Sequence, residues 1–408
     1  MRKTKTYMLV ITIAALILYI PTIYAQQEFD THIYTKGSAD DFKLSSECKG
    51  CHPLIYEEWS KSMHSQATYS KDSLHNTLKE VYEHALLEKG ETPGYFCAHC
   101  HAPMVKDMEF VILGDKLLEK NDPLETEAVG CTFCHSIESA HDGMPTRYYK
   151  LAVDGSVQSP GYSTMDTPAH EKKANPIFKT EEVCSGCHGY LKNQLGVNIC
   201  SLKEEEWDGV TQCQVCHFRE IDGKPSAMST REKHHSHAAP GGHDEEWLQD
   251  CVTLSARYPL YIRKKKTIDF EVSIYNHSAH KLPSTMPFRM VVLKVTAMDI
   301  DGNVLWENFK TDPMKEDPKA VFMKVFGAGD KVGVPTWEAE KIVMDTRIPA
   351  KNKIDLKYNI PAKKVSLVTA DLLYYVIPGP MIDLFQIQKD GYVEESHLIK
   401  NVSVMFLD

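Results

Sequence analysis

The chain has 408 residues, of which 42% are hydrophobic and 25% charged, and its formal net charge is −10 with a pI near 6.0. This composition is typical of a folded globular protein, and the length favours two to three domains. The negative net charge argues against a nucleic-acid-binding protein, because such proteins present a basic face to the phosphates.

The first 25 residues are typical of an export signal. A basic start is followed by the apolar residues 7–23, and a cleavage site fits after Ala25. Pro21, near the end of the apolar run, suits a cleaved signal better than a membrane-spanning helix. We therefore predict a signal peptide over residues 1–25 and export to the periplasm or the cell surface. The alternative is a retained membrane anchor, which would be the chain's one contact with a membrane.

Five Cys-x-x-Cys-His motifs follow within residues 26–251, which we predict to form one domain. They contain ten of the twelve cysteines, in the groups Cys48–Cys51–His52, Cys97–Cys100–His101, Cys131–Cys134–His135, Cys184–Cys187–His188 and Cys213–Cys216–His217. This pattern is typical of c-type haem attachment, in which both thiols form thioethers and the imidazole ligates the iron. Zinc ribbons do not need a histidine after every second cysteine, and a redox CxxC usually occurs once. The sequence therefore predicts five covalently attached haem c groups.

Each iron needs a second axial ligand or an open position. The 19 histidines suffice for a second imidazole on every iron, which would keep the irons closed to substrates. The candidates are His64, His170, His237, His243 and His280. Two glycines between His237 and His243 would let the backbone approach a flat ring closely, and His280 would join the C-terminal domain to the haem domain. Reserve candidates for the second axial ligand, ranked below these five, are His84, His141, His234, His235 and His277.

Cys200 and Cys251 lie outside the five motifs. An exported protein meets an oxidising compartment, which permits a disulfide between them. Two unpaired buried thiols are the alternative, because the sequence does not show whether the two residues are close.

The motif-bearing region shows little sustained alternation of apolar and polar residues. A helix is expected over residues 73–89, with apolar Leu74, Leu78, Val81 and Leu86. Much of the remainder is rich in loop-forming residues. The stretch of chain available per haem is too short to form much of an apolar core. We therefore expect the porphyrins to fill the interior.

The pattern changes near residue 252. Residues 268–274 alternate between apolar and polar, and a second run covers residues 290–298 before the turn signal Asp301-Gly302. Further strands are expected over residues 304–306, 338–344, 353–358 and 365–376. We therefore predict an α+β multidomain protein, with a mostly helical and loop haem domain followed by an all-β, immunoglobulin-like sandwich over residues 252–408.

Several further residues accompany the motifs. They are Tyr56, Trp59, Ser62 and His64 after the first motif, Ala102-Pro103 after the second, Gly130 and Phe133 at the third, Cys200, Trp207 and Gln214 at the fifth, then the His237–His243 loop and the segment holding His280. Together they cover most of residues 45–300 and resemble the multihaem cytochromes c related to the tetrahaem electron carrier of ammonia-oxidising bacteria. The resemblance implies electron transfer, with the histidines outside the motifs as distal ligands.

We therefore expect an exported pentahaem cytochrome that transfers electrons through mainly bis-His haems. Its expected partners are other cytochromes or a quinol-oxidising membrane complex, and not nucleic acid. One alternative is a reductase or oxidase acting on a small nitrogen or sulfur compound at one five-coordinate haem. Another is a subunit of an extracellular cytochrome filament, formed by homo-oligomerisation.

Overall fold

The computed structural model describes residues 42–118, 122–141, 148–152, 154–162, 169–262, 265–284, 286, 288–387 and 391–406. All of these residues belong to a single compact unit. The predicted signal peptide, residues 1–25, lies outside the described residues. The predicted domain boundary at residues 251 and 252 stays a prediction.

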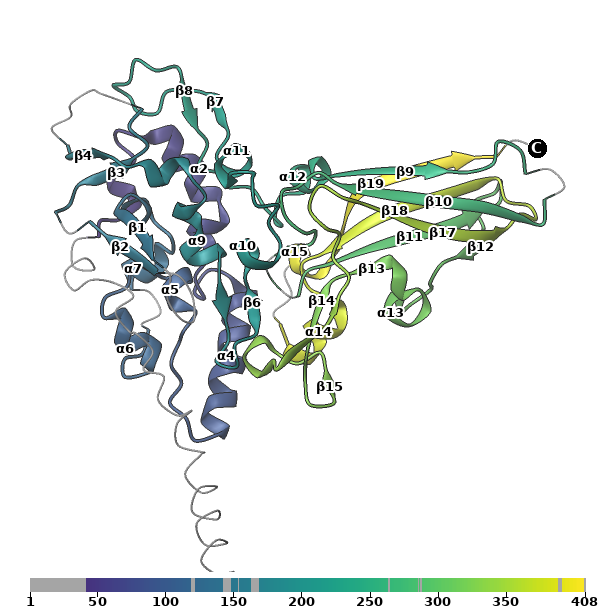
Figure 1. Ribbon diagram of the computed structural model, residues 1–408, viewed down its shortest axis with the longest axis horizontal. Helices are drawn as coiled ribbons and strands as arrows, with labels where there is room; N and C mark the ends of the chain where they lie inside the picture. The colour runs from purple at the N-terminus through teal and green to yellow at the C-terminus, as the bar shows by residue number, and fades with distance from the viewer. Residues whose placement is uncertain are drawn as a thin grey trace, which may run out of the picture. The chain divides into compact units, whose positions relative to one another are not determined.

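Two helices dominate the first part of the described chain (Figure 1). Helix α2 (Pro53–Lys61) begins with a proline at its first turn, where no backbone donor is needed. Helix α4 (Ser73–Glu88) begins at Asp72, whose side chain accepts the His75 backbone N–H at 3.1 Å. The helix expected over residues 73–89 is therefore confirmed.

Helical turns carry the Cys-x-x-Cys-His motifs. The first motif follows the 3₁₀ helix η2 (Ser45–Glu47), and the other four lie in or beside α5 (Ala98–His101), α8 (Cys131–Cys134), α9 (Glu182–His188) and α11 (Cys213–His217). A helical turn brings residues three apart to the same face. Both cysteines of a motif therefore point to one side, as attachment to one porphyrin requires.

Short elements complete this part of the chain. They are α3 (Met63–Gln66), α6 (Met108–Leu113), α7 (Pro123–Thr126), η3 (Pro176–Lys179), α10 (Leu202–Glu205), α12 (Glu245–Asp250), and the strands β1 (Ile137–His141), β2 (Tyr148–Leu151), β3 (Val157–Ser159), β4 (Lys172–Ala174), β5 (Leu191–Lys192), β6 (Asn198–Cys200), β7 (Glu220–Asp222) and β8 (Lys233–His235). The strands pair as β1–β2, β3–β4, β5–β6 and β7–β8. The predicted scarcity of long strands before residue 252 is confirmed.

Long antiparallel strands form two sheets in the second part of the chain. One has the order β17-β10-β9, with β9 (Val252–Arg257), β10 (Thr267–Asn276) and β17 (Lys353–Pro361). The other has the order β12-β11-β18-β19, with β13 also paired to β11, and comprises β11 (Met290–Met298), β12 (Val304–Glu307), β13 (Val321–Phe322), β18 (Leu367–Tyr375) and β19 (Ser396–Met405). In β10 every second residue is buried, as the alternating sequence predicts.

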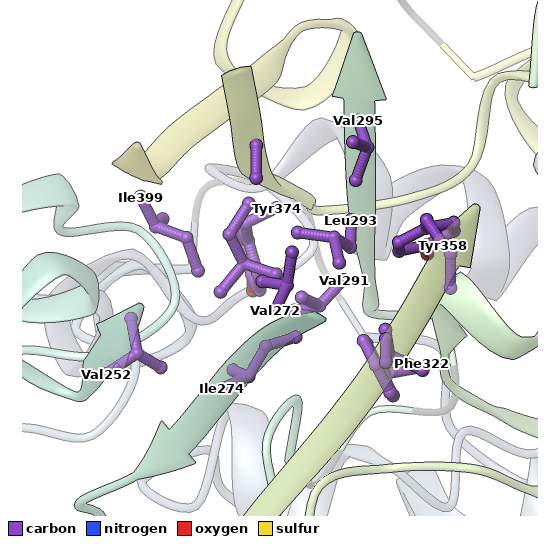
Figure 2. Close-up of a cluster of buried hydrophobic side chains, with 14 of the residues drawn as sticks. Val252, Val272, Ile274, Val291, Leu293, Val295, Phe322, Tyr358, Tyr374 and Ile399 are labelled. Atoms are coloured by element: carbon purple, nitrogen blue, oxygen red, sulfur yellow. The ribbon is translucent and has the colours of Figure 1, made fainter. Parts of the chain in front are cut away.

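The two sheets share one hydrophobic core. Figure 2 shows Val272 and Ile274 of β10 in the same cluster as Leu293 of β11 and Tyr374 of β18. Val272, Ile274 and Leu293 are fully buried. Together with the helices of the first part, these packed sheets make the chain an α+β protein, as expected. The immunoglobulin-like character of residues 252–408 stays a prediction.

A third sheet and several short helices lie between the long strands in sequence. The sheet has the order β15-β14-β16, with β14 (Lys324–Ala328), β15 (Lys331–Val332) and β16 (Lys341–Asp345). The helices are α13 (Pro313–Glu316), η4 (Pro318–Ala320), η5 (Thr336–Glu338), α14 (Gly379–Phe385) and α15 (Gly391–Glu394). Across the described ranges, every helix is too short or too polar to cross a bilayer.

Candidate haem-binding sites

Backbone carbonyls orient four of the five motif histidines. In each of them the Nδ1–H donates to a carbonyl oxygen from a distant segment: His52 to Pro225 at 2.6 Å, His101 to Ala67 at 2.8 Å, His135 to Gln158 at 2.7 Å and His217 to Pro240 at 2.7 Å. Such a bond fixes the tautomer and leaves Nε2 with the lone pair that a metal binds. The local geometry therefore prepares these rings as iron ligands.

Three of the five motif histidines, His135, His188 and His217, face a histidine from outside the motifs. An imidazole nitrogen lies about 2 Å from a bound metal ion, so two rings on opposite sides of one iron have centroids about 6 Å apart. The observed centroid distances are 6.2 Å for His188 and His64, 6.4 Å for His135 and His237, and 6.4 Å for His217 and His280. The spacing of all three pairs fits a shared iron.

The facing histidines come from different kinds of segment. His64 lies in α3, His237 follows β8, and His280 follows β10. Burial is the largest cause that lowers the ring pKa of two of them, to about 4 for His64 and to about 3 for His237. Burial also lowers the pKa of His135 and His217. The rings of His64, His237, His135 and His217 are therefore neutral at physiological pH, which is the form that ligates iron.

The other two predicted distal ligands lie in different surroundings. His170 lies close enough to His135 to lower that ring's pKa, although burial is the larger cause. The Nδ1 of His170 is buried without a hydrogen-bond partner. His243 instead lies beside Arg289, whose Nη2 donates to its Nε2 at 3.1 Å, and it stacks on Tyr392 with centroids 5.2 Å apart. Its role as a ligand stays a prediction.

The second motif has a different neighbour, His75, which the sequence analysis missed. The His75 and His101 rings are 4.0 Å apart at 84°, and both Nδ1 atoms donate to the Ala67 carbonyl. The Nε2 of His75 contacts the Tyr95 hydroxyl. That spacing is too short for an iron between the rings. In the sequence, His75 stands in the first turn of a predicted helix. That position does not distinguish a histidine beside a haem from a surface histidine.

The reserve histidines bond to other groups. His84 lies 3.7 Å from Glu88, His141 approaches Ser139, His234 contacts Glu58 and Gly223, His235 donates to Phe218, and His277 approaches Thr253. His234 has both ring nitrogens within 2.9 Å of oxygen atoms. That ring therefore has no nitrogen left for a metal.

Cysteines of different motifs contact one another. The thiols of Cys48 and Cys131, of Cys100 and Cys187, and of Cys184 and Cys213 are in hydrogen-bond contact. The contact raises the pKa of Cys48 far above its ordinary value and lowers the pKa of Cys131 to about 7. Burial raises the pKa of the Cys134 thiol, and the nearby Cys187 thiol raises it further. The fourth motif thus contacts the second and the fifth and lies near the third, and the third contacts the first.

The two cysteines outside the motifs are free thiols. The Cys200 sulfur lies 3.8 Å from the Met286 sulfur. Burial raises the pKa of Cys200 to about 12 and that of Cys251 to about 11. The disulfide that the sequence left open is therefore not formed in this structure.

Five attachment motifs, oriented proximal rings and facing imidazoles at the spacing of a shared iron define a c-type cytochrome with several haems. Comparison with known proteins agrees. Residues 47–136 match the family of cytochrome c554 and c-prime. The chain is a multihaem cytochrome c, and its haem c groups are covalently attached.

Among solved structures, the chain is similar to a penta-heme cytochrome c552 from Thermochromatium tepidum. The two are 26% identical with a TM-score of 0.74, and the match covers 89% of this chain and 99% of that one. This neighbour supports five haems, one for each motif. A second structure, described as the putative ApaA protein from Bordetella pertussis, has a TM-score of 0.18 and 11% identity, over 38% of this chain and 91% of that one. No curated protein matches the chain.

Proposed function

We propose that the protein is an exported pentahaem cytochrome that carries electrons between partner proteins. The observation that carries this proposal is the set of three histidine pairs with centroids 6.2–6.4 Å apart. With an imidazole on both faces, an iron is closed to substrates and suited to electron transfer. His64, His237 and His280 are then the distal ligands of the fourth, third and fifth haems.

The contacts between motifs support a branched electron path. When bound, the haems supply the redox centres, and the chain fixes their separation and surroundings. The first motif would connect to the third, the third to the fourth, and the fourth to both the second and the fifth. We propose His170 for the first iron, since both His170 and His52 of the first motif lie near enough to His135 to lower its pKa, and the His170 Nδ1 has no hydrogen-bond partner.

The N-terminal segment and the net charge support a location outside the cytoplasm and docking of redox partners. Residues 1–25 support export by a cleaved signal peptide. The net charge of −10 supports salt-dependent docking of other cytochromes or a quinol-oxidising membrane complex. We also propose that residues 252–408 form an immunoglobulin-like sandwich whose role is packing and docking.

The test is spectroscopic, on protein matured in a host that attaches haem c. The proposal expects intact mass to account for five haems and magnetic circular dichroism to give low-spin ferric signals for at least three of them. Loss of electron transfer in the His64→Ala and His237→Ala variants would support the path through the fourth and third haems. Mainly high-spin signals would overturn the bis-His proposal.

A second candidate function rests on the second motif. His75 lies too close to His101 to share an iron with it, which favours an open position on that haem. An open iron with Tyr95 and His75 nearby could reduce or oxidise a small nitrogen or sulfur compound. Carbon monoxide binding to the reduced protein, followed by turnover assays with nitrite, hydroxylamine and sulfite, distinguishes the two functions. No binding and no turnover would exclude the enzyme.

A further inference from the structure

The segment after strand β10 carries His280 toward the fifth motif. The His280 ring stacks opposite the His217 ring at 16°. It lies in a loop, which by itself would leave the ring free to move and would weaken any bond to a metal. The contacts that hold this loop therefore decide how well His280 ligates the fifth iron, on the function proposed above.

Asn276, the last residue of β10, lies at the centre of these contacts. Its side chain is fully buried. The amide Nδ2 lies 2.8 Å from the His280 carbonyl oxygen and 3.1 Å from the carbonyl oxygens of Ile348 and Pro349. The amide Oδ1 accepts the Ser278 backbone N–H at 2.9 Å and lies 2.6 Å from the Ser278 hydroxyl. One side chain thus joins both ends of the His280 turn to a neighbouring segment.

Backbone contacts hold the loop on both sides. Leu282 and Ile348 exchange two backbone hydrogen bonds of 2.9 and 2.8 Å. Ala279 accepts the Asp208 N–H at 2.8 Å, and Asp208 stands shortly before the fifth motif. The turn that holds His280 is therefore bonded directly to the segment that leads to Cys213 and His217.

We propose that Asn276 is a positioning residue that fixes His280 opposite His217, so that strand β10 sets the sixth ligand of the fifth haem. An amide suits this task because it donates and accepts at once. A buried hydrogen-bond network that is fully satisfied also fixes one geometry and disfavours others. Without the amide, the His280 carbonyl would lose a donor and the turn could relax away from His217.

The experiment compares four variants of the full-length haem-loaded protein by magnetic circular dichroism and by redox titration. His280→Gly removes the imidazole and is expected to convert the signal of one haem from low-spin to high-spin, with recovery on adding external imidazole. Asn276→Ala is expected to give part of the same change and the same recovery. Ser278→Ala, which removes the hydroxyl 2.7 Å from the His280 carbonyl, is expected to give a smaller change in the same haem.

Asn308→Ala is the matched control. Asn308 also bonds backbone groups with its amide, accepting from Val295 at 2.8 Å and donating to Leu293 at 3.0 Å, but these contacts lie away from His280. It should lower thermal stability without changing the haem signals. Equal spectral changes in Asn276→Ala and Asn308→Ala would overturn the proposal, because the effect would then follow from general loss of stability.

The outcomes separate this inference from the proposed function. If His280→Gly changes a haem signal and neither Asn276→Ala nor Ser278→Ala does, the positioning role is wrong and the haem assignment stands. If His280→Gly leaves every signal unchanged, both the fifth-haem assignment and the positioning role are wrong, while the His64 and His237 variants still test electron transfer. If Asn276→Ala does not fold, the Ser278→Ala signals decide.

Discussion

The His64 ring faces the His188 ring with centroids 6.2 Å apart, although His64 lies shortly after the first motif and His188 belongs to the fourth. The Val129 N–H donates to the His64 carbonyl at 3.0 Å, and the Trp59 indole donates to the Val129 carbonyl at 2.9 Å. These bonds tie the helices after the first motif to the segment before the third. The contact between His64 and His188 therefore depends on the packing of three motif segments together.

Removing His64 should change one haem. We expect His64→Ala to convert the fourth haem from low-spin to high-spin and to make it bind carbon monoxide when reduced, because one axial position opens. The measurement is magnetic circular dichroism with carbon monoxide titration. His84→Ala is the control, since the His84 side chain is exposed and its Nδ1 lies 3.7 Å from a Glu88 carboxylate oxygen. An unchanged spectrum in His64→Ala would contradict the assignment.

The glycine inside the fourth motif should be irreplaceable. A Cβ on Gly186 would lie 2.3 Å from the ring of Tyr149, whose hydroxyl accepts the Gly186 N–H at 2.9 Å and donates to the Val183 carbonyl at 2.8 Å. Overpacking of this kind costs about 1–3 kcal/mol. We expect Gly186→Ala to lower the melting temperature and the haem content, as measured by calorimetry and pyridine haemochrome assay.

The first motif offers the matched comparison. Gly50 occupies the same place in its motif, and a Cβ there would meet nothing within 4 Å. Gly50→Ala should therefore retain full haem content and stability. Equal losses in the two variants would mean that the motif itself, and not Tyr149, requires glycine.

A buried ion pair should stabilise the fold. Arg347 and Glu206 are in contact, and their side chains are 3% and 0% exposed. Removing one partner of a buried ion pair lowers the free energy of unfolding by about 3–5 kcal/mol. Asp345 also accepts a hydrogen bond from Arg347 at 2.8 Å and would still balance part of its charge. We therefore expect Glu206→Gln to lower the free energy of unfolding by an amount near the lower end of that range. Denaturant unfolding measures this. Glu57→Gln, which breaks an exposed pair with Lys61, should cost less than about 1 kcal/mol; a similar cost for both would contradict the prediction.

Asp345 should contribute a dependence of stability on pH. Burial alone would raise the pKa of Asp345, but hydrogen bonds from Arg347 and Lys281 outweigh it and hold the pKa well below the ordinary value of 3.8. The unfolded chain therefore binds the proton more readily, and the stabilisation is present above pH 3.8 and lost as the pH falls below it. We expect Asp345→Asn to be less stable at pH 7 and to flatten acid unfolding below pH 4. Asp269→Asn, on the exposed face of β10, should leave the acid transition unchanged.

The sequence predicted the chemistry better than the arrangement. The five motifs are local, so Cys48, His52 and their counterparts follow from spacing alone. The motif-like loops of His64, His237 and His280 predicted them as distal ligands, and the structure places each ring opposite a motif histidine. Which proximal ring each one faces depends on long-range packing that no local pattern encodes.

The omissions have the same cause. His75 looks like an ordinary residue in the first turn of α4, and its place beside His101 arises only because both rings donate to Ala67. His243 shares its loop with His237, but its ring lies beside Arg289, and its role as a ligand stays a prediction. Strand β19 was not predicted either, since its pairing with β18 across nine register positions is a long-range contact.

Anomalous diffraction at the iron absorption edge, on crystals of the haem-loaded protein, tests the central claim most directly. We predict five iron peaks, three of them midway between the ring pairs His64 and His188, His135 and His237, and His217 and His280. Fewer than five peaks, or irons displaced from those midpoints, would contradict the proposed bis-His electron carrier.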